Sequence, residues 1–309
     1  MIEDSRRFYD EYVAGMIHER FPGYESRIAV GIAGEGSDCF GYDDVISRDH
    51  DFGTGVCLWV LDEDMDRIGE ELSGAYEAIV LQKERSYYTD RLRERRGVMT
   101  VHDFYSNILQ TDCNTSECRM TESQWLALDH SCLATAVNGE VFRDDEGCFT
   151  RFRRLLLGHY PERVWRIRIA ENMHGFSSSL QVNYQRCMVR RDIVAAEECR
   201  IKGMEAAMEL FFLLRKTYMP FYKWSYRALT ELDTGGIFAQ RIDEMARLHA
   251  DEAAWISTKY HPNRPNLKDR VVGLSEDIAY DLSEMLKDMG LISRINPYLE
   301  ADVDTVLMR

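Results

Sequence analysis

The sequence predicts an α+β protein in which a mixed N-terminal half with a small sheet precedes an all-helical C-terminal half. Two observations support this prediction. Runs of β-branched residues beside glycine-rich turns occur only in the first half, and helical periodicity dominates from Phe152 onward. The two halves correspond to domains over residues 1–150 and 151–309, and a chain of 309 residues is long enough to bury two separate cores.

The N-terminal half begins with alternating helical and extended patterns. Apolar residues at helical spacing predict a helix between Ser5 and Phe21. The run Arg27–Ala33 predicts a strand that enters a glycine-rich turn, and Asp51–Val60 predicts a second strand. Acidic residues after the second strand favour a helix start, and the helical pattern continues over Met65–Leu81.

The remaining strand signals come before residue 150. The basic and aromatic segment 82–96 is interpreted as a long connection, and the run VMTVHDF after Gly97 as a third strand. Asn138–Phe142 is followed by an acidic turn and is interpreted as a hairpin or as a short strand flanked by turns. Helical patterns then cover Leu155–Leu157, Val164–Ala170, Ala195–Leu214, Phe238–His249 and Ser275–Met289.

Charge and composition exclude several classes of protein. The 38 basic and 53 acidic residues leave a net charge of −15, which disfavours wrapping of duplex DNA by a basic surface. No apolar run approaches the roughly 20 residues of a membrane span, and the charged first twenty residues do not resemble a signal peptide. The sequence therefore predicts a cytoplasmic protein without a membrane partner, and it leaves the oligomeric state open.

The eight cysteines are scattered, and the one close pair is Cys113 and Cys118. This pair has no second pair of ligand spacing and no histidine motif beside it, so reduced, mostly buried thiols are favoured over a structural zinc site.

The segment GEGSDCFGYDDVISRDHDFG, residues 34–53, carries the chemistry. Gly36 and Ser37 follow one predicted strand, and Asp49 and Asp51 open the next. The alternation of a strand places both aspartates on one face, where their charges repel unless a divalent cation such as Mg²⁺ lies between them. The glycine-serine turn offers unhindered N–H groups and a hydroxyl, which can hold phosphate oxygens.

These four residues resemble the nucleotidyltransferase superfamily typified by DNA polymerase β and the aminoglycoside nucleotidyltransferases. The signature of that superfamily is a Gly-Ser turn, a spacer of about ten residues and an Asp-x-Asp strand. Together with NGEVFRDDEG and LFFLLRKTYMPFYKW, the segment is more closely similar to a bacterial branch of the superfamily classed as a domain of unknown function. The resemblance extends over most of the chain.

The resemblance implies transfer of a nucleoside monophosphate from ATP or another nucleoside triphosphate to an acceptor hydroxyl, with release of pyrophosphate. Ser37 and the amides around Gly36 would hold the β and γ phosphates. Asp49 and Asp51 would bind Mg²⁺, which lowers the charge on the α-phosphate and orients the acceptor for in-line attack.

The superfamily usually carries a third carboxylate on a later strand, and this chain departs from that pattern because VMTVH contains no acid. Asp103 is the first candidate and Glu140 the second. Asp103 has an alternative interpretation as the N-cap of a helix that begins at DFYSNIL. Lys223 in PFYKW fits the helix-borne lysine that members of the superfamily send to the triphosphate, and its alternative is a solvated lysine beside an aromatic cluster.

The acceptor is not identified by the sequence. Two basic regions, residues 82–96 and Arg151–Arg168, would lend positive potential to a cleft, although exposed helix faces explain them equally well. The acidic balance of the whole chain favours a small, cationic acceptor over tRNA or a protein. A second class of function is a non-catalytic nucleotide-sensing or interaction module that lacks the third carboxylate.

Overall fold

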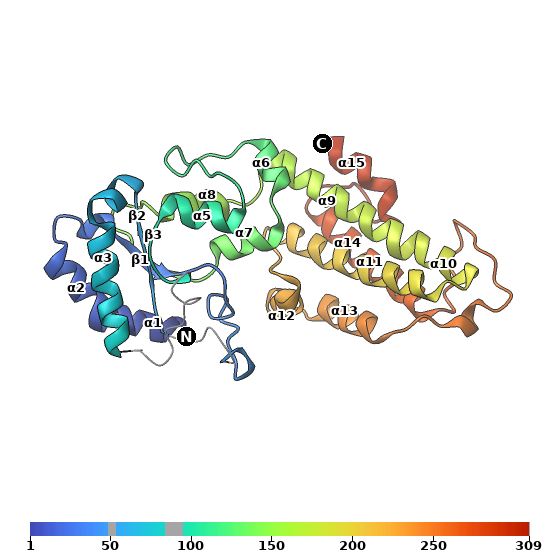
Figure 1. The fold of residues 1–309 in the computed structure, drawn as a ribbon. Helices are drawn as coiled ribbons and strands as arrows, with labels where there is room; N and C mark the ends of the chain where they lie inside the picture. Colours follow the sequence, from blue (N-terminus) through green and yellow to red (C-terminus); the bar gives the residue numbers. More distant parts are fainter. Residues whose placement is uncertain (49–53, 84–94, 309) are drawn as a thin grey trace. The chain divides into compact units, whose positions relative to one another are not determined.

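The computed structural model describes residues 1–48, 54–83 and 95–308. The chain divides into two compact units, residues 1–159 and 160–309, and each is described by itself (Figure 1). Every strand that the structure describes lies in the first unit, and the second unit is helical, so the predicted α+β class is confirmed at this level. Residue 150, where the sequence predicts the domain boundary, is the first residue of helix α8 (Thr150–Leu157) in the first unit.

A four-stranded mixed sheet with the order β3-β2-β1-β4 organises the first unit. The strands are β1 (Ala29–Ile32), β2 (Cys57–Val60), β3 (Gly97–Thr100) and β4 (Glu140–Arg143). β1 is antiparallel to β2 and β4, and β2 is parallel to β3. The end of β1 therefore meets the starts of the other three strands at one edge of the sheet, which we call the β1-exit edge. In the register, Ile32 pairs with Glu140, and Cys57 pairs with both Gly31 and Gly97.

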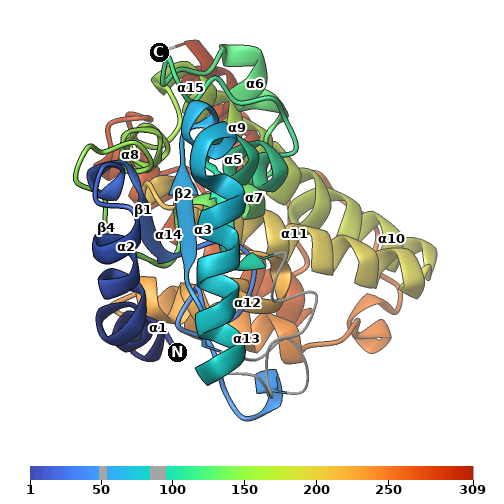
Figure 2. The same ribbon diagram turned by 60° about the vertical axis from the view of Figure 1, so that its left-hand side comes forward.

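One face of the sheet is covered by helices that precede and follow its first two strands. The predicted N-terminal helix is confirmed as α1 (Ile2–Phe8), a π-helical segment (Tyr9–Val13) and α2 (Ala14–Arg20), and the next as α3 (Asp62–Lys83). Figure 2 shows α1, α2 and α3 beside the strands of this sheet. Leu58 and Val60 of β2 belong to the same buried cluster as apolar residues of these helices. The alternation of β2 thus gives this face its apolar residues.

Trp59 points to the opposite face, where an aromatic cluster forms the second layer of the core. Its ring stacks on Phe149 with centroids 3.7 Å apart, and Phe104 lies edge-on to it at 5.3 Å. Phe104 belongs to α5 (Val101–Leu109), and Phe149 directly precedes α8. Large buried rings of this kind bury 150–250 Å² each in proteins, roughly, so this cluster is a principal source of stability in the unit.

The predicted third strand is only partly right. β3 ends at Thr100, and the run VMTVHDF continues as α5 because the Thr100 hydroxyl accepts a hydrogen bond from the Asp103 N–H (2.9 Å). Thr100, not Asp103, is therefore the N-cap of this helix. Two short helices that the sequence analysis did not predict follow it, α6 (Glu122–Ala127) and α7 (His130–Val137). β4 pairs with β1, so the strand interpretation of Asn138–Phe142 holds and the hairpin interpretation does not.

The second unit is built of helices packed around α11. The helices are α9 (Glu162–Phe176), a π-helical segment (Ser177–Asn183), α10 (Tyr184–Arg190), α11 (Ile193–Leu214), α12 (Tyr222–Leu232), α13 (Ile237–Arg247), α14 (Arg270–Asp288) and α15 (Val303–Met308). Short 3-10 helices cover Glu25–Arg27, Ile46–Arg48, Glu252–Trp255 and Leu299–Asp302 in the two units.

A buried carboxylate joins separate parts of this helical unit. Asp269, which is fully buried, accepts hydrogen bonds from the Tyr184 hydroxyl (2.9 Å) and the Trp255 indole N–H (2.6 Å). Its other oxygen caps α14 by accepting from the Val271 N–H (2.8 Å). Within the described residues, no helix is long and apolar enough to span a membrane.

Candidate functional site

The loop that leaves β1, residues 34–37, which we call the glycine-serine loop, contains the positions predicted to hold phosphate. Gly34 and Gly36 have φ angles of 104° and 121°, a region that favours glycine. A Cβ at Gly36 would lie 2.2 Å from Asp38 Oδ1, so this position also needs the small residue for space. Among the described residues, neither the N–H groups of Glu35, Gly36 and Ser37 nor the Ser37 hydroxyl has an acceptor. Consecutive unpaired N–H groups of this kind suit an anion.

A buried ion pair holds the residues that directly follow Ser37 at the end of this loop. Arg96, just before β3, donates to Asp38 Oδ2 (2.7 Å) and to the Cys39 sulfur (3.1 Å). The Arg96 side chain is 1% exposed and the Asp38 side chain 18%. Asp38 Oδ1 also accepts from the Cys39 N–H (3.0 Å). The pair ties the loop after β1 to the start of β3 at the β1-exit edge.

The start of the loop, at Gly34, is held by Asn138, which lies between α7 and β4. Its side-chain oxygen accepts from the Gly34 N–H, and its side-chain NH₂ donates to the Gly34 carbonyl, both at 2.8 Å. Asn138 thus satisfies both backbone groups of Gly34 at the point where β1 has ended.

The two thiols near the loop, those of Cys39 and Cys57, are buried. Burial raises the pKa of the Cys39 thiol, and the nearby Arg96 opposes this shift only in part. Burial likewise raises the pKa of Cys57. Both groups therefore stay protonated near neutral pH, and the eight cysteines of the chain are all free thiols in the structure.

The structure brings some of the predicted site residues to one edge and separates others. Gly36 and Ser37 follow β1, and Glu140 begins β4, so all three lie at the β1-exit edge. Asp49 and Asp51 lie outside the described residues. Within residues 1–48, 54–83 and 95–308, no three histidine, cysteine or acidic side chains are grouped to hold a metal ion.

Asp103 follows the end of β3, at the edge of the sheet opposite to Ser37. It lies in the first turn of α5, with its carboxylate 3.6 Å from His102. Glu140 is exposed and forms an ion pair with Arg6 of α1. The topology therefore favours Glu140 over Asp103 as an acid close to the glycine-serine loop.

Lys223 lies in the second unit, in the first turn of α12, where it is exposed. Its ammonium group lies 5.0 Å from the centre of the Trp224 ring. This arrangement fits the alternative of a lysine beside an aromatic cluster, and the role of Lys223 at a triphosphate stays a prediction.

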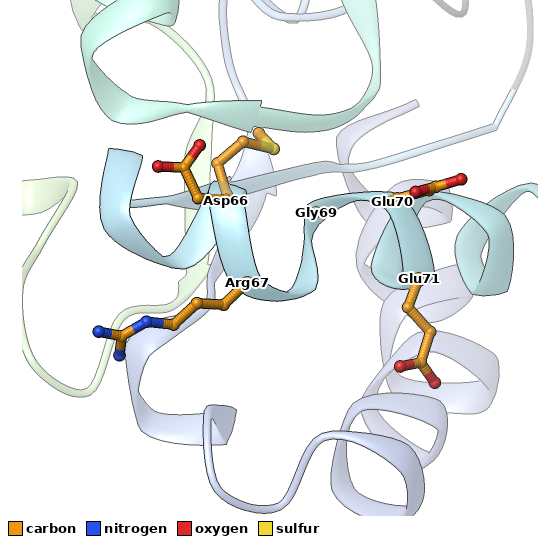
Figure 3. A pocket seen from close by; sticks show the side chains of 6 residues that line it. Asp66, Arg67, Gly69, Glu70 and Glu71 are labelled. Atoms are coloured by element: carbon orange, nitrogen blue, oxygen red, sulfur yellow. The ribbon is translucent and has the colours of Figure 1, made fainter.

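A hollow of about 400 Å³ lies on α3, away from the β1-exit edge. Its lining consists of Met65, Asp66, Arg67, Gly69, Glu70 and Glu71 (Figure 3). All six residues come from consecutive turns of one helix, and Glu71 is paired with Arg20 (3.1 Å). The hollow is a surface feature of α3 and contributes nothing to the glycine-serine loop.

A family model described as a domain of unknown function, DUF4037, matches residues 125–225. The matched segment covers about a third of the chain and includes Asn138, Glu140 and Lys223, but not the glycine-serine loop. No curated protein and no solved structure matches the chain.

The contacts that the sequence analysis missed are those of Asn138 and Arg96. Their partners are 104 and 58 residues away along the chain, so no local spacing predicts them. The Asn-Gly pair at residues 138 and 139 is the one local signal of a special backbone position in this segment.

Proposed function

We propose that this protein is a cytoplasmic, magnesium-dependent nucleotidyltransferase that moves a nucleoside monophosphate from a nucleoside triphosphate to an acceptor hydroxyl. The observation that supports this proposal most is the loop after β1, with three consecutive N–H groups and the Ser37 hydroxyl left without an acceptor among the described residues. Such a loop provides donors for phosphate oxygens without a basic side chain.

In this proposal, separate residues of the chain bind the phosphates, bind the metal ion and accept the proton. Gly36 and Ser37 bind the β and γ phosphates through backbone N–H groups and the hydroxyl. Asp49 and Asp51, on the segment that leads into β2, supply the carboxylate oxygens that Mg²⁺ prefers. The bound ion would neutralise charge on the α-phosphate. Of the two candidates for the third carboxylate, Glu140 lies at the same edge and would accept the proton of the acceptor hydroxyl.

The antiparallel pairing of β1 and β2 supports the proposal that the phosphate-binding loop and the metal-binding aspartates belong to one site. Because the end of β1 and the start of β2 share an edge, the segment that contains Asp49 and Asp51 connects the loop at Ser37 to the same edge at Cys57. The phosphate donors of the loop and the carboxylates that we propose as metal ligands would then serve one bound triphosphate. The net charge of −15 favours a small, cationic acceptor.

The test is a transfer assay. The purified protein is incubated with Mg²⁺ and each of the four α-³²P-labelled nucleoside triphosphates, together with a small-molecule fraction, a tRNA fraction and a protein fraction of a cell extract. We expect label in the small-molecule fraction and release of pyrophosphate. Label in the tRNA or protein fraction would show that the acceptor is tRNA or a protein and not a small molecule. Tight binding of a triphosphate with no transfer in any fraction would favour a nucleotide-sensing module instead.

A further inference from the structure

The glycine-serine loop is flexible by composition but is held in one conformation by a segment far away in the sequence. Gly34 and Gly36 of this loop have positive φ angles, and ordering glycine-rich backbone costs more conformational entropy than ordering other residues. A loop that is already ordered binds its ligand without this cost. The structure shows which side chain orders it.

Asn138 makes two opposed hydrogen bonds to Gly34, accepting from its N–H and donating to its carbonyl, both at 2.8 Å. These two bonds extend the pairing of β1 with β4 to a position two residues beyond Ile32 and Glu140, with the Asn138 side chain in place of a backbone partner. The Gly34 peptide is therefore fixed, and with it the direction in which the next N–H groups point.

The approach of Asn138 depends on the residue after it. Gly139 has a φ of 68°, and a Cβ there would lie 1.9 Å from the carbonyl oxygen of Ile32. Only glycine lets the chain pass this close to the end of β1. Arg153 of α8 also holds this segment, because its guanidinium donates hydrogen bonds to the carbonyls of Val137 (2.6 Å) and Gly139 (3.3 Å).

From this geometry we infer that Asn138 is a positioning residue for triphosphate binding, which keeps the N–H groups of Glu35, Gly36 and Ser37 in the orientation that receives the phosphates. Arg153 supports Asn138 by holding the carbonyls of the residues on either side of it. The inference rests on the proposed function, and it gives a role to the part of the DUF4037 match that contacts the loop.

The experiment measures binding of Mg²⁺ complexes of ATP, GTP, CTP and UTP by calorimetry to the wild type and to Asn138→Ala. For the nucleotide that binds, we expect a roughly fivefold to tenfold higher Kd at unchanged stoichiometry. The loss of the side-chain bonds that order the loop should cost about as much binding free energy as one net hydrogen bond. Asn114→Ala is the matched control. Asn114 also accepts from a backbone N–H, that of Glu117 (3.0 Å), in an exposed turn elsewhere, and its loss should leave Kd unchanged.

Each further outcome counts against a specific statement. An unchanged Kd in Asn138→Ala, or a lower stoichiometry with an unchanged Kd, would overturn the positioning role while leaving the proposed function intact. A wild type that binds none of the four nucleotides would instead overturn the proposed function. If Asn138→Ala fails to fold, Arg153→Lys replaces it, with a smaller rise in Kd expected and an unchanged Kd overturning the inference.

Discussion

The Arg96 guanidinium lies 2.7 Å from the Asp38 carboxylate, almost completely enclosed, and joins the loop after β1 to the start of β3. The two residues are unequal partners. Asp38 keeps some contact with solvent, whereas Arg96 has nearly none, so removing the negative charge leaves a buried cation without compensation.

Asp38→Asn should therefore lower the free energy of unfolding by roughly 3 kcal/mol, because the Arg96 charge stays buried and unpaired. Arg96→Met should cost less, since an apolar side chain of similar length replaces the cation. Urea unfolding monitored by circular dichroism measures both. Asp145→Asn, which removes a partner of Arg143 from an exposed pair, serves as the control and should cost less than about 1 kcal/mol. Equal losses for Asp38→Asn and Asp145→Asn would contradict the buried ion pair.

Asp49→Asn and Asp51→Asn should each abolish nucleotide transfer and leave thermal stability unchanged or raised. Each substitution removes a proposed metal ligand and relieves repulsion between carboxylates in the metal-free protein. Initial rates at saturating Mg²⁺ and melting temperatures give the two readouts. Asp66→Asn on the exposed face of α3 is the control. Activity within tenfold of the wild type, or about 1.4 kcal/mol of barrier, would speak against the metal assignment.

Lys223→Ala should weaken binding of a nucleoside triphosphate tenfold to a hundredfold, roughly, and hardly change binding of the monophosphate. The expected loss is that of a charge-assisted contact to the β or γ phosphate. Calorimetric titration of both nucleotides with Mg²⁺ separates the two effects. Lys287→Ala, in the last turn of α14, is an exposed control. If the triphosphate binds Lys223→Ala as well as the wild type, Lys223 is a surface lysine.

Gly139→Ala should destabilise the protein by more than about 2 kcal/mol, because its Cβ would meet the backbone of Ile32 and Ala33, which cannot rotate away. Gly74→Ala is the opposite case. Gly74 lies in α3 with nothing within 4 Å of its added Cβ, so this variant should gain about 0.5–1 kcal/mol of helix stability. Urea midpoints of the two variants compare them directly, and a neutral Gly139→Ala would contradict the close approach.

His102 should contribute stability only at low pH. Its hydrogen bond to the Asp112 carboxylate (2.8 Å) raises the pKa of the imidazole, and burial opposes this shift in part. A raised folded-state pKa adds stability that is complete below the unfolded pKa of about 6.5 and is lost as the pH rises through the folded value.

The free energy of unfolding of the wild type should accordingly exceed that of His102→Gln by less than about 1 kcal/mol near pH 5.5 and by nothing near pH 8.5, since the Asp112 carboxylate is largely exposed to solvent. Urea unfolding at the two pH values measures the difference. Asp112→Asn should remove the same pH dependence. A stability gap that is constant with pH would show that His102 acts through packing alone.

The strands and long helices were predictable from the sequence where one periodicity ran without interruption. The run VMTVHDF was not, because its first half pairs with β2 and its second half turns into α5 at the Thr100 cap, with no change in hydrophobicity. The two helices after it are short, and their caps at Thr121 and Asp129 were the only local signals.

The candidate site shows the same limit. Gly36 and Ser37 were identified because they are neighbours in the sequence, and the turn that they form is local. Asn138 and Arg96 were missed because their bonds to the loop close only when the sheet is assembled. The sequence alone favours Asp103 over Glu140, because Asp103 directly follows an apolar run. The parallel pairing of β2 and β3 instead places Asp103 at the edge opposite to Ser37.

The pairing of β1 with β4 also sets the order of events during synthesis. β1 ends at Ile32, yet its partner strand begins at Glu140, so more than a hundred residues must leave the ribosome before the sheet has its fourth strand. Until then, the edge of β1 that later receives β4 exposes its unpaired N–H and C=O groups. A nascent chain that stops before Asn138 lacks the clamp on Gly34 as well. The first unit therefore acquires an ordered loop after β1 only once its last strand has been made.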